Sequence, residues 1–155
     1  MAPTEAVTHR IRFLSLEQVV TMHDFLLRRF GGSAGGGARG AAYEGVDAAV
    51  QAVKNSYYET LEELAAAYAV YIVQGHVFLD GNKRTGAAAM LVLLEANGRA
   101  VAIRGDKLAA LMIEIQQRAE AGADVGAIIR WVAQRLASSS KRPHRARRPS
   151  RRKGE

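Results

Sequence analysis

One stretch of ten residues, 76–85, concentrates more side chains capable of joint chemistry than any other part of this sequence. It reads His-Val-Phe-Leu-Asp-Gly-Asn-Lys-Arg-Thr and holds an imidazole, a carboxylate, an amide, two cations and a hydroxyl. The runs on either side, 64–73 and 87–94, contain no charged residue. A dense polar segment between two apolar, core-like runs indicates a functional site.

The second half of this segment has the composition of an anion site. A helix that begins near Asn82 would leave backbone N–H groups of its first turn unpaired and would carry a positive dipole there. Gly81 would let the backbone approach a ligand, while Lys83 adds a point charge and Arg84 can hold phosphate oxygens through paired hydrogen bonds. Phosphate is therefore the expected ligand of Gly81, Asn82, Lys83 and Arg84.

The first half could supply a metal ligand and a base. A polyphosphate needs Mg²⁺, and Asp80 is the only carboxylate of the segment, so it is the candidate metal ligand beside water and phosphate oxygens. His76 carries an imidazole, the side chain best suited to accept a proton from an attacking hydroxyl at neutral pH. Phe78 is expected to point inward and to anchor the loop to the core.

Each of these residues also has an ordinary structural interpretation. His76 could cap a helix that ends near Gly75, and Asp80 could be an N-cap. Lys83 and Arg84 could belong to a solvated face. For any one residue alone this interpretation is favoured, but five functional groups in order with an enabling glycine are much less expected by chance. The residues themselves indicate an anion site with a nearby base.

Helices are expected around the segment, because the chain uses much Ala and Leu and only 6% aromatic residues. Capping boxes are expected at Ser15 and Thr60, N-caps at Asp106 and Asp124, and a left-handed cap at Asn97-Gly98. Residues 11–13 and 99–104 are expected to be short extended links. Hydrophobic periodicity predicts helices over 15–30, 43 to about 56, 60 to the segment, about 82 to 96, 106–118 and 124–136.

The two helices that flank the segment are apolar nearly all round, so they are expected inside the domain. The sequence therefore predicts an all-α, single-domain helical bundle with the site loop between two central buried helices. His23, in the first helix, is expected to pack or to hydrogen-bond within that helix. The expected domain organisation is a flexible N-terminus over 1–10, the helical domain over 11–137 and a disordered basic tail over 138–155.

The net charge of +7 belongs to that tail. From Ala137 onward there are eight basic residues against the single acid Glu155, and removing them from the totals of 22 basic and 15 acidic residues leaves 14 of each. The neutral body argues against a nucleic-acid surface on the domain, whereas the tail could contact RNA or the ribosome through nonspecific charge. The absence of cysteine excludes disulfides and thiolate chemistry.

A glycine-rich loop offers a rival nucleotide motif. Residues 35–40 fit G-x-G-x-x-G, but that fingerprint requires a preceding strand and a βαβ unit, whereas a helix is expected before this loop. We therefore interpret residues 31–40 as a flexible loop rather than a dinucleotide site.

The segment 76–85 resembles the signature of the Fic/Doc superfamily, H-x-F-x-[DE]-[AG]-N-[KG]-R. It is similar to the Doc (death-on-curing) branch, because Lys83 stands where Fic enzymes have glycine. A weaker resemblance runs from Ile11 to Gly98. Its markers are Arg12-Phe13-Leu14, His23, Phe30-Gly31-Gly32, Arg39 and Asn97-Gly98.

The resemblance implies ATP and Mg²⁺ as co-substrates and transfer to a protein hydroxyl. Fic enzymes transfer AMP, whereas Doc toxins transfer the γ-phosphoryl group to a threonine of elongation factor Tu and so stop translation. By motif position, His76 would be the base and Asp80 the Mg²⁺ ligand, with the phosphate held by Asn82, Lys83 and Arg84. We expect a Doc-type kinase toxin; the alternatives are an AMP transferase and a non-catalytic module with a nucleic-acid-binding tail.

Regulation and location can also be predicted. Many Fic enzymes carry an inhibitory helix, [ST]-x-x-x-E-[GN], but the candidate here, Glu44-Gly45, is preceded by Gly40 at the first position. We therefore expect a separate antitoxin whose C-terminal segment folds against the domain. Residues 1–5 lack the basic start of a signal peptide, and no apolar run approaches membrane-spanning length, so we expect a cytoplasmic protein without membrane contact.

Overall fold

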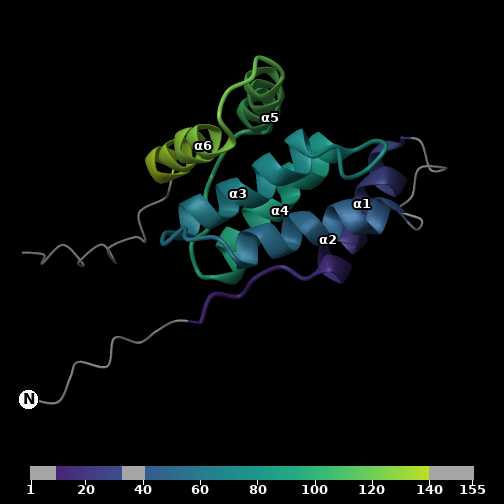
Figure 1. Cartoon of the computed structure of the whole chain (residues 1–155), viewed down its shortest axis with the longest axis horizontal. Helices are drawn as coiled ribbons and strands as arrows, with labels where there is room; N and C mark the ends of the chain where they lie inside the picture. Colours follow the sequence, from purple (N-terminus) through teal and green to yellow (C-terminus); the bar gives the residue numbers. More distant parts are fainter. Residues whose placement is uncertain (1–9, 33–40, 140–155) are drawn as a thin grey trace, which may run out of the picture.

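The computed structural model describes residues 10–32 and 41–139, and within these ranges it contains six α-helices (Figure 1). The expectations for the N-terminus, for the rest of the glycine loop and for the tail beyond Ser139 lie outside the described residues. The predicted all-α class is confirmed. The helices are α1 (Leu16–Phe30), α2 (Ala41–Lys54), α3 (Leu61–Gln74), α4 (Asn82–Ala96), α5 (Gly105–Glu120) and α6 (Val125–Ser139).

Helices α3 and α4 pack closely together at the centre of the bundle (Figure 1). Ten of the 14 residues of α3 are buried, so this helix has neighbours on nearly every side, as its composition predicted. Gly86 of α4 lies directly against α3. A Cβ placed there would be 2.9 Å from Cγ2 of Val73 and 3.2 Å from the Ala69 carbonyl oxygen. The small residue therefore sets how closely the two helices approach.

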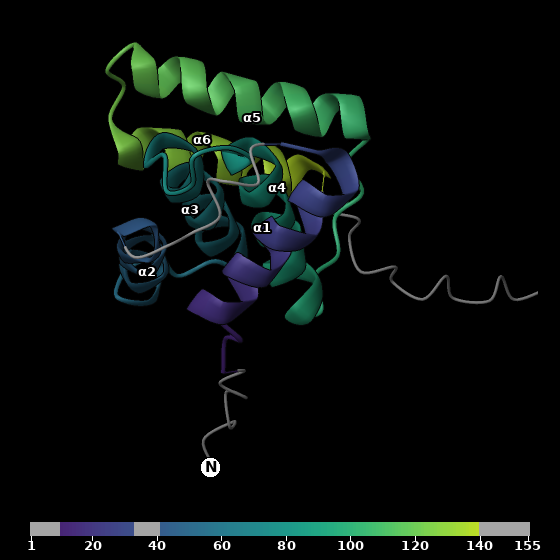
Figure 2. The same ribbon diagram turned by 90° about the vertical axis from the view of Figure 1, so that its right-hand side faces the viewer.

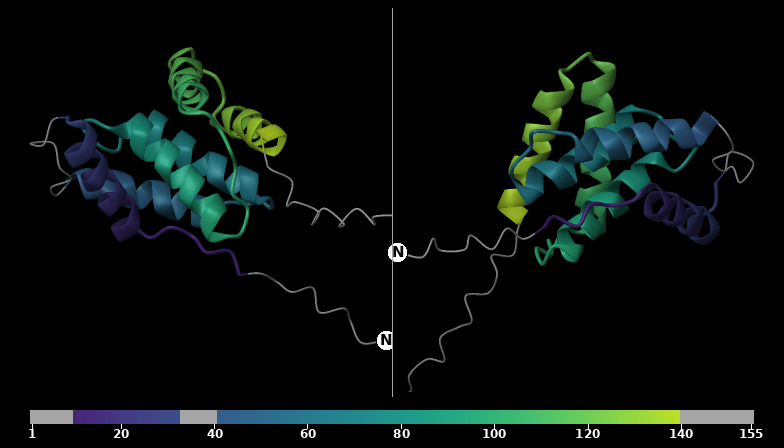
Figure 3. Two further views of the ribbon diagram at one scale, coloured as in Figure 1. Left: turned by 180° about the vertical axis from the view of Figure 1, so that it is seen from behind. Right: turned by 60° about the horizontal axis from the view of Figure 1, so that its bottom comes forward.

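The remaining helices cover this central pair from two directions. Figure 2 shows α5 and α6 together on one side of α3 and α4, with α1 and α2 on the other. The two views of Figure 3 show the same division from behind and from below. As a result, the loop between α3 and α4 can be reached by α1 and α5, which lie far apart in the sequence. Within the described ranges, no helix combines the length and the apolar character needed to cross a membrane.

The two expected capping boxes differ in detail. At Ser15 the box is complete, because its Oγ accepts from the Gln18 N–H and the Gln18 Oε1 accepts from the Ser15 N–H. At Thr60 the Oγ1 accepts from the Glu63 N–H, but the Glu63 carboxylate accepts from the Thr60 hydroxyl instead of its N–H. The side-chain cap of α3 is therefore present without the reciprocal backbone bond.

One of the two aspartate N-caps is confirmed and the other is wrong. Asp124 accepts from the Ala127 N–H at 3.0 Å and caps α6. Asp106, in contrast, lies inside the first turn of α5, whose N-cap is Arg104, and its carboxylate pairs with that arginine at 3.3 Å. An acid in the first turn also stabilises the helix dipole, so the residue type alone could not separate the two positions.

The end of α4 holds the chain that leads into α1. Gly98 has φ +77° and donates to the Glu95 carbonyl, which completes the expected left-handed cap. The side-chain oxygen of Asn97 accepts from the Arg12 N–H at 2.8 Å, and its amide group donates back to the Arg12 carbonyl. The lead-in is therefore non-helical, as expected, and fixed to the bundle. Several expected bounds differ slightly, since α2 spans Ala41–Lys54, α5 spans Gly105–Glu120 and α6 continues to Ser139.

Candidate active site

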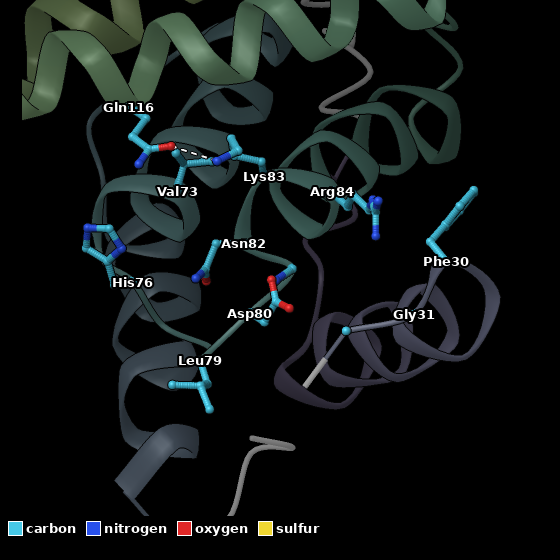
Figure 4. Close-up of a pocket in the computed structure, with 12 residues that line it drawn as sticks. Phe30, Gly31, Val73, His76, Leu79, Asp80, Asn82, Lys83, Arg84 and Gln116 are labelled. Atoms are coloured by element: carbon cyan, nitrogen blue, oxygen red, sulfur yellow. Dashed lines mark hydrogen bonds between the residues drawn. The ribbon is translucent and has the colours of Figure 1, made fainter. Parts of the chain in front are cut away.

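A cavity of about 530 Å³ lies where the loop between α3 and α4 meets α1 and α5 (Figure 4). It brings together six residues that the sequence singled out, namely His76, Asp80, Gly81, Asn82, Lys83 and Arg84. The other lining residues are Phe30, Gly31, Gly32, Val73, Leu79 and Gln116. The segment 76–85 therefore forms one wall of a cavity that two distant helices complete.

His76 occupies an unusual backbone position at the start of the loop. Helix α3 ends at Gln74, and His76 follows with φ +45°, a left-handed conformation that non-glycine residues rarely adopt. Its imidazole is exposed at the cavity and, among the described residues, makes no hydrogen bond to the end of α3. The interpretation of His76 as a helix cap is therefore not supported, and the imidazole is accessible to a ligand.

Asn82 braces the loop with its side chain. Its Oδ1 accepts from the Phe78 N–H at 2.9 Å, and its Nδ2 donates to the Phe78 carbonyl at 2.8 Å. These two bonds tie the amide to the backbone of Phe78 and leave the second Nδ2 hydrogen, together with the backbone N–H of Asn82, as possible donors to a phosphate. Helix α4 has no side-chain N-cap bond, and Gly81 precedes it with φ +81°. Gly81 has no side chain that could cover the first N–H groups of α4, and the residues 81–84 at this helix start all line the cavity.

The two cations of the segment stand at opposite walls. Lys83 donates from Nζ to the Gln116 Oε1 at 2.8 Å, which fixes its ammonium group beside α5. Arg84 lies with its guanidinium carbon 5.0 Å from the centre of the Phe30 ring, beside the end of α1. The first turn of α4 contains no acidic residue. Figure 4 shows both side chains and Asp80 around the same space, so positive charge frames the cavity.

Asp80 lies in the part of the cavity between His76 and Arg84 (Figure 4). Its Oδ1 accepts from the Gly81 N–H at 2.7 Å, and a Cβ added to Gly32 would come within 3.0 Å of its Oδ2. Among the described residues there is no group of three or more His, Cys, Asp or Glu that could hold a metal. Mg²⁺ does not require one, because it commonly uses one or two carboxylates with phosphate oxygens and water. The single carboxylate therefore fits a Mg²⁺ ion that arrives with a nucleotide.

Phe78 and His23 anchor the loop to the buried core. Phe78 is 3% exposed, and its ring stacks on the His23 imidazole with centroids 3.7 Å apart and an interplanar angle of 4°. The inward orientation expected of Phe78 is thus observed. His23 packs as expected, but its hydrogen bond leaves α1 and reaches the Asp80 carbonyl, 2.7 Å from Nε2.

Two lining residues escaped the sequence argument for different reasons. Gln116 lies on α5, 31 positions after the end of the segment, and an isolated glutamine in an amphipathic helix carries no local signal of a site. Gly32 appeared in the sequence only as part of the Phe30-Gly31-Gly32 marker and of the glycine-rich loop, whereas its lack of a side chain makes room for Asp80.

Comparison with known proteins agrees with the motif. The model of the Fic/DOC family matches residues 13–94, which include the whole segment 76–85. A protein named "Protein kinase doc" from Escherichia phage P1 is 37% identical over 90 residues, which is 57% of this chain and 70% of that protein. Gln116 and helices α5 and α6 lie outside the family match. With the match covering more than half of its length and the motif placed in the cavity, the chain belongs to the Fic/Doc family.

Proposed function

We propose that this protein is a Doc-type toxin, a kinase that transfers the γ-phosphoryl group of ATP to a protein hydroxyl. The observation that carries the proposal is the cavity itself, in which an exposed imidazole, a carboxylate and two cations surround the start of helix α4. The similarity to a protein named as a kinase supports phosphoryl transfer in particular. The proposed target is a threonine of elongation factor Tu, whose modification would stop translation. The reaction then belongs in the cytoplasm, where both ATP and this factor are found.

The geometry of the cavity supports the proposed residue roles. The phosphates lie against the backbone N–H groups at the start of α4, with Lys83 and Arg84 at their sides. His76 accepts the proton of the target hydroxyl as its oxygen bonds to the γ-phosphorus. The bond from that phosphorus to the β–γ bridging oxygen breaks, and ADP leaves with the electron pair. Every proton and electron pair is thus assigned to a named group.

Asp80 is proposed to hold Mg²⁺ against the nucleotide. When bound, the ion would supply positive charge that offsets the negative charge developing on the phosphate oxygens. The hydrogen bond from the Gly81 N–H orients the Asp80 carboxylate before any ligand arrives. Because the carboxylate is already oriented, no further reorganisation free energy is needed during the reaction. Such preorganisation makes electrostatic stabilisation effective.

AMP transfer is the competing reaction within the same family. It would break the bond between the α- and β-phosphates and release pyrophosphate. Lys83 favours phosphoryl transfer, because the family signature has glycine there in enzymes that transfer AMP. The bond from Lys83 to Gln116 supports this assignment, since it keeps a bulky cation at the cavity wall where glycine would leave open space.

Restraint by a separate antitoxin completes the proposal. The inhibitory sequence found in many Fic enzymes is absent from residues 40–45, so a toxin of this type needs a partner. An apolar groove of about 620 Å³ adjoins the cavity and shares Phe30, Lys83 and Arg84 with it. A segment of the antitoxin bound in this groove would reach the cations that the phosphates need.

Mass spectrometry of the intact target tests the reaction type. Elongation factor Tu is incubated with the protein, ATP and Mg²⁺, with a reaction lacking the protein as the control. We expect the factor to gain the mass of one phosphoryl group, located by fragmentation to a threonine. A gain equal to one AMP group would replace the kinase assignment with AMP transfer. An unchanged mass would refute elongation factor Tu as the target.

A further inference from the structure

His23 lies against the active-site loop at Phe78, Asp80 and Gly81, although it precedes the loop by more than fifty residues. Its ring stacks on Phe78, and its Nε2 is 2.7 Å from the Asp80 carbonyl oxygen. A Cβ placed on Gly81 would stand 3.4 Å from the His23 Cδ2 and 3.5 Å from its Nε2. Helix α1 therefore reaches the backbone on both sides of the Asp80 carboxylate through one side chain.

The hydrogen bond to Asp80 shows that Nε2 of the His23 ring carries a proton. A carbonyl oxygen can only accept, so Nε2 of His23 carries the proton and donates to Asp80. The side chain is 1% exposed, and Nδ1 has no hydrogen-bond partner within the described residues, the nearest charge being Asp24 at 3.7 Å. Leucine would fill such a buried position without leaving a polar atom unpaired. The cost of keeping an imidazole there is offset by the bond to the loop.

The bond acts on the part of the loop that matters for metal binding. The direction of the Asp80 carboxylate depends on the conformation of the Asp80 backbone. Its Oδ1 also accepts a hydrogen bond from the neighbouring Gly81 N–H. The carbonyl end of Asp80 is held by His23 instead. With both ends fixed, the carboxylate can present one orientation to a ligand. Partners that orient a metal-binding carboxylate commonly change metal affinity or activity by roughly 10- to 100-fold when they are removed.

We propose that His23 is a positioning residue for the Asp80 carboxylate and acts through its Nε2 hydrogen bond to the Asp80 backbone. This inference rests on the proposed function, in which Asp80 holds Mg²⁺ with the nucleotide. The ring of His23 touches Phe78 and the loop backbone and does not line the cavity. Its effect is therefore on the geometry of Asp80 and not on the reacting atoms.

The experiment separates the hydrogen bond from the packing of the ring. His23→Phe keeps a flat ring against Phe78 but removes the donor, whereas His23→Gln places an amide Nε2 within reach of Asp80 but removes the ring. Val19→Ala is the matched control, because Val19 is fully buried one turn earlier on the same helix. For each variant, calorimetry measures the affinity for a non-hydrolysable ATP analogue with and without Mg²⁺, and thermal unfolding measures stability.

We expect His23→Phe to lose roughly 10- to 100-fold of the gain in analogue affinity that Mg²⁺ gives the wild type. His23→Gln and Val19→Ala should retain most of that gain, even where their melting temperatures fall. If His23→Phe does not fold, His23→Asn, whose amide is too short to reach Asp80, takes its place against His23→Gln.

A full Mg²⁺-dependent gain in the variant without the donor would overturn the inference and leave His23 as a core residue only. An equal loss in His23→Gln would also overturn it, because packing and not the hydrogen bond would then be responsible. A wild-type protein that binds the analogue equally well with and without Mg²⁺ would refute the metal role of Asp80 in the proposed function itself.

Discussion

His76 stands out among the site residues because the backbone there adopts a conformation that disfavours an L residue. His76 has φ +45°, and among the described residues its side chain makes no hydrogen bond to the end of α3 that would favour this conformation. Such strain persists where the surrounding structure enforces it, commonly at active sites. Here the rigid ends of α3 and α4 impose the turn that exposes the imidazole to the cavity.

Replacing His76 tests its role as the base. We expect His76→Ala to lower kcat for target modification by roughly 10²- to 10⁴-fold, the usual contribution of a general base. Affinity for the ATP analogue should change little, since the proposed site holds the phosphates at the start of α4 and not at His76. Steady-state kinetics and calorimetry on the same preparation measure both quantities. A variant as active as the wild type would eliminate His76 as the base.

Gln116 allows a test of how Lys83 is held. Without the acceptor at 2.8 Å, the lysine side chain regains rotamer freedom that nucleotide binding must again restrict. We expect Gln116→Ala to raise KM for ATP about fivefold, which corresponds to about 1 kcal/mol for one hydrogen bond. Gln117→Ala is the matched control, because Gln117 is the exposed neighbour and does not line the cavity. Equal KM values in the two variants would show that Lys83 does not need this support.

At the residue level, the sequence predicted the motif members but not how they are used. The spacing of His76, Asp80 and Arg84 placed them at one cavity because a short loop and one helical turn keep them close. The hydrogen-bond partners of the Asn82 amide could not be predicted, because its bonds to Phe78 depend on how tightly the loop turns. Gln116 could not be found at all, since its position depends on how α5 docks.

Among the elements, the contact between α3 and α4 does most to set the position of the loop. Gly86→Ala would force a methyl group to within 2.9 Å of Val73, which itself lines the cavity. We expect this overpacking to reduce the free energy of unfolding by about 1–3 kcal/mol, measured by urea denaturation. Gly105→Ala is the control, since nothing lies within 4 Å of an added Cβ at that position on α5. Equal stability of the two variants would contradict a close α3–α4 contact.

The attachment of the lead-in to α3 predicts a pH dependence of stability. The Tyr68 hydroxyl is buried and bonds to the backbone of Leu14, and burial raises its pKa above the ordinary value of 10.0, while the bond to Leu14 lowers it by less. A raised pKa means that the folded state binds the proton more strongly, so this stability is complete below pH 10.0 and is lost as the pH rises through the folded pKa.

We therefore expect the free energy of unfolding to decline above about pH 10, and to decline less steeply in Tyr68→Phe, which has no hydroxyl to ionise. Urea denaturation at a series of alkaline pH values measures the two slopes. Identical slopes would mean that Tyr68 does not contribute to the alkaline decline.

The helices themselves were largely predictable because their signals are local. The capping box at Ser15 and the glycine at 98 act within a few residues and were observed as expected. Asp106 shows the limit of such signals, because an acid is favourable both at an N-cap and in the first turn. Whether Asp106 is the N-cap or lies in the first turn depends on where α5 begins, and here the N-cap is Arg104.

For the whole molecule, the separation of charge between a neutral body and a basic tail predicts that target modification and nonspecific RNA binding can be separated. Deleting residues 140–155 removes all eight tail cations together with Glu155. We expect the shortened protein to modify its target at the wild-type rate and to lose nonspecific, salt-sensitive RNA binding. Filter binding at several salt concentrations, with the kinetic assay in parallel, measures both. Loss of target modification with unchanged RNA binding would contradict this division.

The most direct test of the central claim follows the phosphorus atoms of ATP. Elongation factor Tu is incubated with the protein, Mg²⁺ and ATP labelled at either the α- or the γ-phosphorus, with His76→Ala as the control. We expect label from the γ position alone to become attached to the factor, and the His76→Ala variant to attach almost none. Attachment of label from the α position alone would contradict the kinase assignment and identify the protein as an AMP transferase.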